Sequence, residues 1–261
     1  HHAASTYVPR TQRGRSENAL RPTGRPKMPS ISSSDGPVAV TGASGYVGAQ
    51  IVLNLVDHGY TVRCCVRDAS NPLKTSHLLA MNSYGAPGKL TLHTADLLTP
   101  GDYDAVFKGC TAVFHVAAVL ERDHQGGGQG SGDVTQQQVY DGGYLATKNV
   151  IESVKKSGSV KRVVYTSSVA GVVGGRPVDH VYTEADWADH GDLFSPKKEL
   201  PYDYGRSKAD TERLLYSEAA KDGSFDVISH NPWHVLGPIM CPSHFEIWQY
   251  RVSGLVQGDA L

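Results

Sequence analysis

Tyr204 and Lys208, four positions apart, are the two side chains of this sequence best suited to transferring a proton. Both fall in the segment 203–221, whose pattern predicts a helix, so they share one face and lie about one turn apart. A phenol with a pKa of about 10 exchanges protons poorly at neutral pH unless something favours its phenolate, which a nearby ammonium does. Because the chain has 13 tyrosines and 25 lysines and arginines, the pair is informative only through its position in the fold.

A glycine-rich stretch indicates a turn that binds phosphate groups. It follows the β-branched run 38–41, precedes a helix-period segment, and consists of Thr41-Gly42-Ala43-Ser44-Gly45-Tyr46-Val47-Gly48. The spacing is G-x-x-G-x-x-G in place of the commoner G-x-G-x-x-G, but the physical reason is shared. Glycines let the backbone turn tightly and approach a pyrophosphate, whose charge lies at the helix N-terminus. Turns collect glycine in any case, so the strand before and the helix after are what favour a dinucleotide site.

The residue that follows the second β-branched run, 61–66, bears on which dinucleotide is bound. A site for NAD usually places an acid there, which accepts a hydrogen bond from the ribose 2′-hydroxyl. Here the position holds Arg67, whose planar guanidinium suits a 2′-phosphate, and Lys74 follows seven residues later. The sequence therefore predicts NADP(H). The neighbouring Asp68 keeps NAD as an alternative, and Arg67 and Lys74 could also be ordinary solvated bases.

The elements that must position these residues alternate between strands and helices. Six strands are predicted, over Val38–Thr41, Thr61–Val66, Leu90–Thr94, Ala112–Ala117, Arg162–Ser167 and Asp226–His230. Helices are predicted over Tyr46–His58, Gln138–Lys156, Asp203–Lys221 and Phe245–Val256, with Val47, Ile51, Val52, Leu55 and Val56 on the buried face of the first. This order predicts an α/β fold of the Rossmann type, a doubly wound parallel sheet with strand order 3-2-1-4-5-6. Ligands of such sheets bind at the carboxyl ends of the strands.

Seven short motifs follow one another along the chain in an order that resembles a known family. They are TGASGYVG at 41–48, VRD at 66–68, ADLL at 95–98, VFHVAA at 113–118, RVVYTSS at 162–168, YGRSK at 204–208 and NPWHVLGP at 231–238. Over roughly residues 36 to 238 the chain resembles the extended short-chain dehydrogenase/reductases, which belong to the NAD-dependent epimerase/dehydratase superfamily. Within them it is most similar to the dihydroflavonol reductase, cinnamoyl-CoA reductase and aldehyde reductase group.

The resemblance implies roles for further residues. Ser168, the second serine of the TSS triplet, would hydrogen-bond the substrate oxygen, with Tyr204 as acid/base and Lys208 tuning it; the alternative for Ser167 and Ser168 is a cap or turn. The positions implied to line the cofactor, besides the glycine turn, Arg67, Lys74, Tyr204 and Lys208, are Asp96 and Leu97 at the adenine end, Val116, Ala117 and Ala118 after the fourth strand, and Asn231 and Pro232 near the nicotinamide amide. His115, inside an apolar strand, is interpreted as a satisfied buried group.

Two departures from the family pattern stand out. Many members carry an asparagine in the helix after the fourth strand, where this chain has Gly143. The reductase group often lacks it too, and Asn149 fits a later, structural position of the motif. Members also usually continue for several tens of residues beyond the point that corresponds to Leu261, so we expect a truncated or reduced C-terminal substrate lobe. Such a lobe would leave an unprotected sheet edge and an incompletely enclosed pocket.

Composition sets the remaining limits. A formal charge of −1 gives no electrostatic case for nucleic acid or an acidic membrane, and no apolar run is long enough to span a bilayer. Cys64, Cys65, Cys110 and Cys241 form no disulfide or metal-binding pattern, so reduced thiols are expected. Residues 1–35, rich in arginine and poor in acids, predict a disordered basic tail, with a transit peptide as the alternative. The compartment predicted is the cytoplasm.

The predicted function is that of an NADPH-dependent oxidoreductase. Residues 36–261 are predicted to form its NAD(P)-binding Rossmann domain, with a partial substrate-binding region. It would reduce a small ketone or aldehyde, or oxidise the matching alcohol, as a monomer or homodimer. Alternatives are a sugar-nucleotide epimerase or hydroxysteroid dehydrogenase on the same scaffold, a non-catalytic NADP-binding sensor, and an inactive truncated fragment. A sensor would not need the Ser168, Tyr204 and Lys208 set. Substrate residues are expected in 120–135, 176–200 and 233–256, where Trp187, Trp233 and Trp248 face either a ring-containing ligand or the core.

Overall fold

The computed structural model describes residues 30–118, 136–174, 177, 179–188, 204–245 and 247–258. The predicted tail up to residue 29 lies outside these residues, as does much of the predicted substrate region. Residues 32–35, expected to end the tail, form a turn beside the domain, and the Tyr60 hydroxyl donates to the carbonyl of the adjacent Ile31 at 2.8 Å. Contacts with the domain therefore begin before residue 36.

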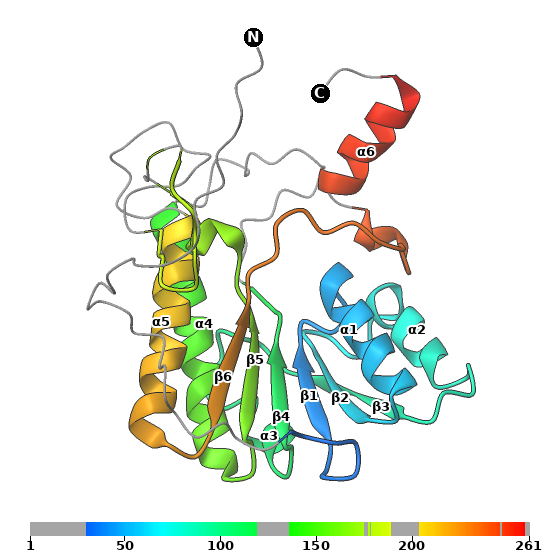
Figure 1. Cartoon of the computed structure of the whole chain (residues 1–261). Helices are drawn as coiled ribbons and strands as arrows, with labels where there is room; N and C mark the ends of the chain where they lie inside the picture. Colours follow the sequence, from blue (N-terminus) through cyan, green and yellow to red (C-terminus); the bar gives the residue numbers. More distant parts are fainter. Residues whose placement is uncertain are drawn as a thin grey trace, which may run out of the picture.

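A single sheet of six parallel strands forms the centre of the fold (Figure 1). Its strands are β1 (Val38–Thr41), β2 (Thr61–Val66), β3 (Lys89–Thr94), β4 (Ala112–His115), β5 (Arg162–Thr166) and β6 (Asp226–His230). Their order across the sheet is β3-β2-β1-β4-β5-β6. The predicted order 3-2-1-4-5-6 is confirmed, and the point where it reverses lies between β1 and β4, where open α/β sheets bind their ligands.

Helices cover both faces of the sheet. In the described residues they are α1 (Tyr46–Asp57), α2 (Pro72–Met81), α3 (Asp104–Phe107), α4 (Gln136–Ser157), α5 (Tyr204–Asp222) and α6 (Ile247–Gln257), with short 3₁₀ turns η1 (Val169–Gly171) and η2 (Pro242–His244). In Figure 1, α1 and α2 lie together on one side and α4 and α5 on the other.

Two hydrophobic cores result from the alternation of side chains along the strands. Val38, Val40 and Cys64 pack with α1 and α2, while Ala39 and Cys65 pack with α3, α4 and α5. Cys64 and Cys65 thus point to opposite faces, and all four cysteines are unpaired, as the sequence predicts. The central strand β1 is buried at every position, as expected for a parallel strand covered on both faces, whereas β3 and β6 at the two edges of the sheet are partly exposed.

The predicted end of β4 is wrong by two residues. The strand ends at His115, and the backbone amides of Val116 and Ala117 donate to the Thr41 hydroxyl at 3.1 and 3.2 Å. A side chain of the neighbouring strand thus replaces the ladder partner. The predicted helix face needs correction too, because Val47 and Ile51 are only half-buried and the small Gly48 and Ala49 take the buried positions.

The pattern did not predict α2 or α3. Helix α2 begins where the Asn71 side chain accepts a hydrogen bond from the Leu73 amide at 3.0 Å, with Pro72 at the first helical position. Its leucines face both ways, since Leu78 is buried while Leu73 is 81% exposed. No apolar stripe therefore marks this helix in the sequence, and α3 is a single turn.

One edge of the sheet is formed by β6. Within the described part of the chain β6 pairs only with β5, and its Ile228 is 41% exposed. Among the described helices, none combines the length and apolar character needed to cross a membrane.

Candidate active site

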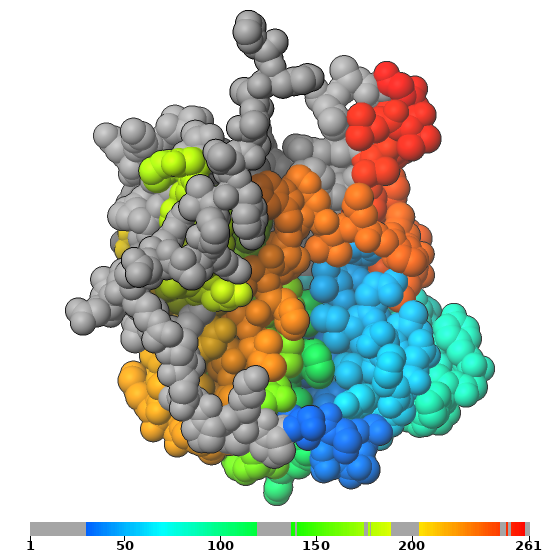
Figure 2. Space-filling view, in the orientation of Figure 1, coloured from blue at the N-terminus to red at the C-terminus, as the bar shows by residue number. Residues whose placement is uncertain are grey.

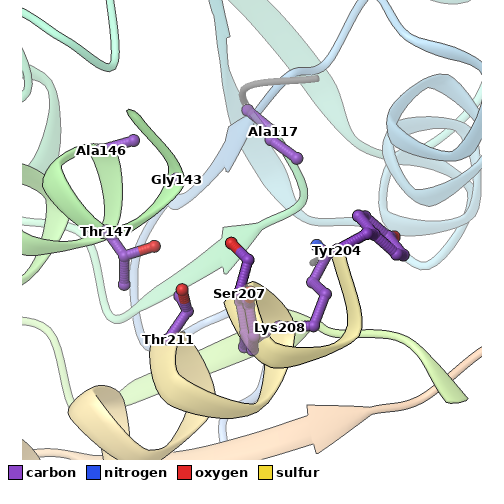
Figure 3. A pocket seen from close by; sticks show the side chains of 10 residues that line it. Ala117, Gly143, Ala146, Thr147, Tyr204, Ser207, Lys208 and Thr211 are labelled. Carbon is purple, nitrogen blue, oxygen red and sulfur yellow. The ribbon is translucent and has the colours of Figure 1, made fainter. Parts of the chain in front are cut away.

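Tyr204 and Lys208 lie on the same face of α5, at the helix end that meets the carboxyl edge of the sheet (Figure 3). Tyr204 is the first residue of the helix and is 40% exposed, whereas Lys208 is only 8% exposed. The Lys208 Nζ lies 5.8 Å from the centre of the Tyr204 ring and donates to the Thr166 carbonyl at 3.2 Å. The phenol therefore faces the open side, with the ammonium beneath it.

Burial of Lys208 changes its acidity. Removing the ammonium from water lowers the pKa of Lys208 to about 8, and the negative charge of Glu212 opposes this change. Glu212 is fully buried one turn further along α5 and accepts a hydrogen bond from Asn231 Nδ2 at 3.1 Å. Glu212 belongs to no motif and was not predicted, although an acid four residues after Lys208 on the same helix face was a usable signal.

Ser168 lies two residues beyond the end of β5, near the same edge. Its hydroxyl oxygen accepts from the Ala170 amide at 3.2 Å and begins η1, so the capping role that was the alternative for this serine is present. Its carbonyl accepts from Asn231 Nδ2 at 3.1 Å, and the Val169 amide donates to the Pro232 carbonyl at 3.0 Å. These bonds bring the predicted Ser168, Asn231 and Pro232 together.

The glycine turn has the tight backbone that a phosphate site requires. Gly42 has a φ of +66°, and a Cβ there would lie 2.9 Å from Ala117. A Cβ on Gly48 would lie 2.1 Å from the Gly42 carbonyl oxygen. Gly45 begins α1 without any side-chain cap, so the first amides of the helix can donate to an anion. The cradle therefore fits a pyrophosphate. Of the other turn residues, Ser44 and Val47 are half-buried and Tyr46 is buried.

Arg67 and Lys74 are both exposed, on either side of the β2–α2 connection, and the Lys74 backbone amide donates to the Asn71 carbonyl at 3.1 Å. The Asp68 carboxylate accepts from the Ser70 hydroxyl at 2.6 Å and from its amide at 2.9 Å, and these bonds lower the pKa of Asp68. Because Asp68 Oδ1 already accepts two hydrogen bonds, Asp68 is a weaker candidate for binding the ribose 2′-hydroxyl. The exposed bases Arg67 and Lys74 therefore favour a phosphorylated ribose over an unmodified one.

The predicted adenine end lies after β3. Asp96 is half-buried and accepts from the Leu98 amide at 2.8 Å, whereas Leu97 is buried in the core. The Leu97 carbonyl accepts from Asn149 Nδ2 at 2.8 Å, which gives Asn149 the structural place expected from the motif. Contact of Asp96 and Leu97 with an adenine remains a prediction.

A small hollow joins the end of β4 to α4 and α5 (Figure 3). Val116, just before it, is half-buried. The residues that line the hollow are Ala117, Ala118, Gly143, Ala146, Thr147, Tyr165, Tyr204, Ser207, Lys208 and Thr211. A Cβ on Gly143 would lie 3.2 Å from Ser207 Oγ, so the asparagine of other family members would require Ser207 to move. Ser207 belongs to the YGRSK motif but was given no role, and no motif marked Thr147 or Thr211 in the sequence.

His115 is a satisfied buried residue, as interpreted from the sequence. Its ring nitrogens hydrogen-bond the hydroxyls of Thr41 at 3.0 Å and Thr147 at 3.2 Å. Burial, and secondarily the charge of Lys208, lower the pKa of His115 to about 3. The imidazole is therefore neutral near pH 7. Of the tryptophans, Trp187 is buried and stacks with Arg213, Trp233 is 47% exposed, and the side chain of Trp248 lies outside the described residues.

Comparison with known proteins gives consistent matches. The family model described as the NAD dependent epimerase/dehydratase family matches residues 38–247. Cinnamoyl-CoA reductase CAD2 of Medicago truncatula is 36% identical over 207 residues, which are 78% of this chain and 59% of that protein. Dihydroflavonol 4-reductase of Hordeum vulgare is 36% identical over 211 residues, 80% of this chain and 56% of that protein.

A solved structure agrees with these sequence matches. Vestitone reductase from alfalfa superimposes with a TM-score of 0.62 at 28% identity, covering 79% of this chain and 59% of that chain. The chain therefore spans somewhat under 60% of the length of these three proteins.

Proposed function

Because the chain belongs to the NAD-dependent epimerase/dehydratase family, we propose that it is an NADPH-dependent oxidoreductase that reduces a small ketone or aldehyde or oxidises the matching alcohol. The observation that carries this proposal is the buried Lys208 ammonium beneath the exposed Tyr204 phenol, at the carboxyl edge of the sheet. The matched relatives whose names denote reductases of cinnamoyl-CoA and dihydroflavonol support the reductive direction.

The residues present fit NADPH. The turn 42–48 would hold the pyrophosphate, and Arg67 with Lys74 the 2′-phosphate. Asp96 and Leu97 would hold the adenine end. Residues 116–118, directly after β4, would line the middle of the bound cofactor, and Asn231 and Pro232 would lie near its nicotinamide amide. When bound, NADPH supplies the hydride.

The chain's own side chains handle the proton and the carbonyl oxygen. The Ser168 hydroxyl donates a hydrogen bond to that oxygen and polarises it. As the carbonyl oxygen gains negative charge, Tyr204 gives its phenolic proton to that oxygen. Lys208 stabilises the phenolate that remains, and Glu212 beside it favours the protonated form of the lysine. In the reverse direction the Tyr204 phenolate takes the proton from the alcohol.

Absorbance of the reduced nicotinamide tests the proposal with a panel of aldehydes and ketones. Tyr204→Phe should lower turnover by about 10²- to 10⁴-fold, the usual contribution of a general acid. The matched control is Tyr216→Phe, three turns further along the same helix, which should keep full activity. NADPH binding without consumption across the panel would overturn the proposal and favour a non-catalytic sensor.

A further inference from the structure

Three metal-binding side chains meet at a place that the oxidoreductase site does not use. His77 lies on α2, whereas Cys241 and His244 begin and end the η2 segment that follows β6. One donor atom from each lies within 4.8 Å of the other two. Figure 2 shows the segment after β6, in orange, directly above α1, in blue. No sequence pattern indicates this cluster, because more than 160 positions separate His77 from the other two residues.

Three of the four ring nitrogens of the two histidines are buried without a hydrogen-bond partner in the described structure. Neither ring nitrogen of His77 has a hydrogen-bond partner in the described structure, and neither does Nδ1 of His244. The two rings meet edge to face with centroids 4.9 Å apart. A buried polar atom that has lost water without gaining a partner destabilises the fold. A neutral imidazole presents one lone pair, so a bound cation would accept one lone pair from His77 and one from Nδ1 of His244.

The second nitrogen of His244 is held in the way that metal-binding histidines usually are. Its Nε2 lies 3.0 Å from the Ser44 carbonyl oxygen. A carbonyl only accepts, so Nε2 carries the hydrogen and Nδ1 of the neutral ring presents a lone pair. A backbone carbonyl that fixes the ring in this manner is a common outer partner of a metal ligand. The Ser243 hydroxyl lies 3.2 Å from Cys241 Sγ, where it can donate to a thiolate.

We propose that His77, Cys241 and His244 bind a Zn²⁺ ion. Two imidazoles and a thiolate form a donor set that zinc prefers, and the absence of carboxylate ligands from the cluster disfavours Mg²⁺ and Ca²⁺. On binding, Cys241 releases its thiol proton to solvent, and a water molecule supplies the fourth ligand from the hollow that His77 and Cys241 line. Donor atoms of a tetrahedral zinc site are about 3.3 to 3.6 Å apart, so the three side chains must move inward by about 1 Å.

Such an ion would join three parts of the chain that are distant in sequence. Ser44 belongs to the glycine turn, His77 to α2, and Cys241 with His244 to the segment after β6. The zinc site would therefore fix that segment against the turn. Because the metal binds the folded chain only, a free zinc concentration 100-fold above its Kd should raise the Tm by about 5 to 10 °C.

Metal titration of the full chain under reducing conditions tests the proposal. Zn²⁺ should bind with one tight site per chain, and Co²⁺ in its place should show thiolate-to-cobalt charge-transfer absorption. Cys241→Ser and His77→Gln should each weaken binding by more than about 100-fold, beyond the usual loss for an outer partner of a ligand. His58→Gln removes an exposed histidine whose Nδ1 lies 2.8 Å from the Asn54 carbonyl oxygen and should leave zinc binding unchanged.

Equal zinc affinity in the wild type and both cluster variants would overturn the proposal and mark the binding as adventitious. So would a cobalt complex without a thiolate band, or displacement of Zn²⁺ by millimolar Mg²⁺. Far-ultraviolet circular dichroism establishes that each variant is folded. If one cluster variant fails to fold, the other decides, because the two substitutions lie on different elements.

Discussion

Replacing Lys208 by methionine should make the folded protein more stable at neutral pH while lowering the proposed activity. The side chain is 8% exposed, and burial lowers the pKa of Lys208 from 10.5 to about 8. At pH 7 the folded state must therefore keep a charge that its surroundings disfavour. Methionine has a similar length and no charge, so it removes this unfavourable contribution.

The magnitude follows from the pKa difference. A difference of about 2.5 pKa units corresponds to about 3 kcal/mol at pH 7. The variant also loses the hydrogen bond from Nζ to the Thr166 carbonyl, which contributes about 1 kcal/mol. The net expectation is a gain of about 2 kcal/mol in the free energy of unfolding of Lys208→Met at pH 7.

The pH dependence has a definite sign. The folded-state pKa of Lys208 is lowered, so between pH 8 and 10.5 the unfolded chain binds more protons than the folded one. Wild-type stability from this group therefore rises with pH in that window. The advantage of the variant should shrink by about 2 kcal/mol between pH 7 and pH 9.5.

Urea unfolding followed by tryptophan fluorescence at both pH values measures these differences. The matched control is Lys221→Met on the same helix, whose side chain is 69% exposed and pairs with Glu218; its effect should be small and similar at both pH values. A Lys208→Met variant no more stable than the wild type at pH 7, or an advantage independent of pH, would refute the account of the buried ammonium.

Three further predictions concern the turn, the cofactor and the buried histidine. Arg67→Asp should shift the ratio of NADPH to NADH affinity by about 10- to 100-fold toward NADH, measured by titration of cofactor fluorescence; an unchanged ratio would remove Arg67 from the 2′-phosphate site. Gly48→Ala should lower stability by more than about 2 kcal/mol in urea unfolding, because its Cβ would lie 2.1 Å from the Gly42 carbonyl oxygen. The contribution of His115 to the free energy of unfolding should fall by about 2 kcal/mol when the pH is lowered from 7 to 5. The reason is that this histidine gains a proton below about pH 6.5 in the unfolded chain but only near pH 3 in the folded one. His115→Gln should lack this loss, and acid sensitivity equal to that of the wild type would contradict the assignment.

The sequence was sufficient for the features that depend on local spacing. Alternation of β-branched runs with helical periods predicted all six strands, and their order followed from the doubly wound fold that this alternation indicates. A four-residue interval was enough to place Tyr204 and Lys208 on one face of α5. The glycines of the turn were recognisable because few other residues tolerate its backbone.

Contacts between distant segments could only come from the folded chain. The Thr41 hydroxyl, on β1, accepts a hydrogen bond from the Val116 amide and so ends the neighbouring strand β4. Thr41 and Thr147 also hydrogen-bond the two ring nitrogens of His115, and nothing in the local pattern marks either threonine for these roles. The depth at which Lys208 is buried, and hence its acidity, depends on β5 and α5 packing together. His77 and His244 meet because α2 and the segment after β6 lie against each other. Local periodicity determines which elements form, whereas desolvation and partner choice depend on how those elements pack.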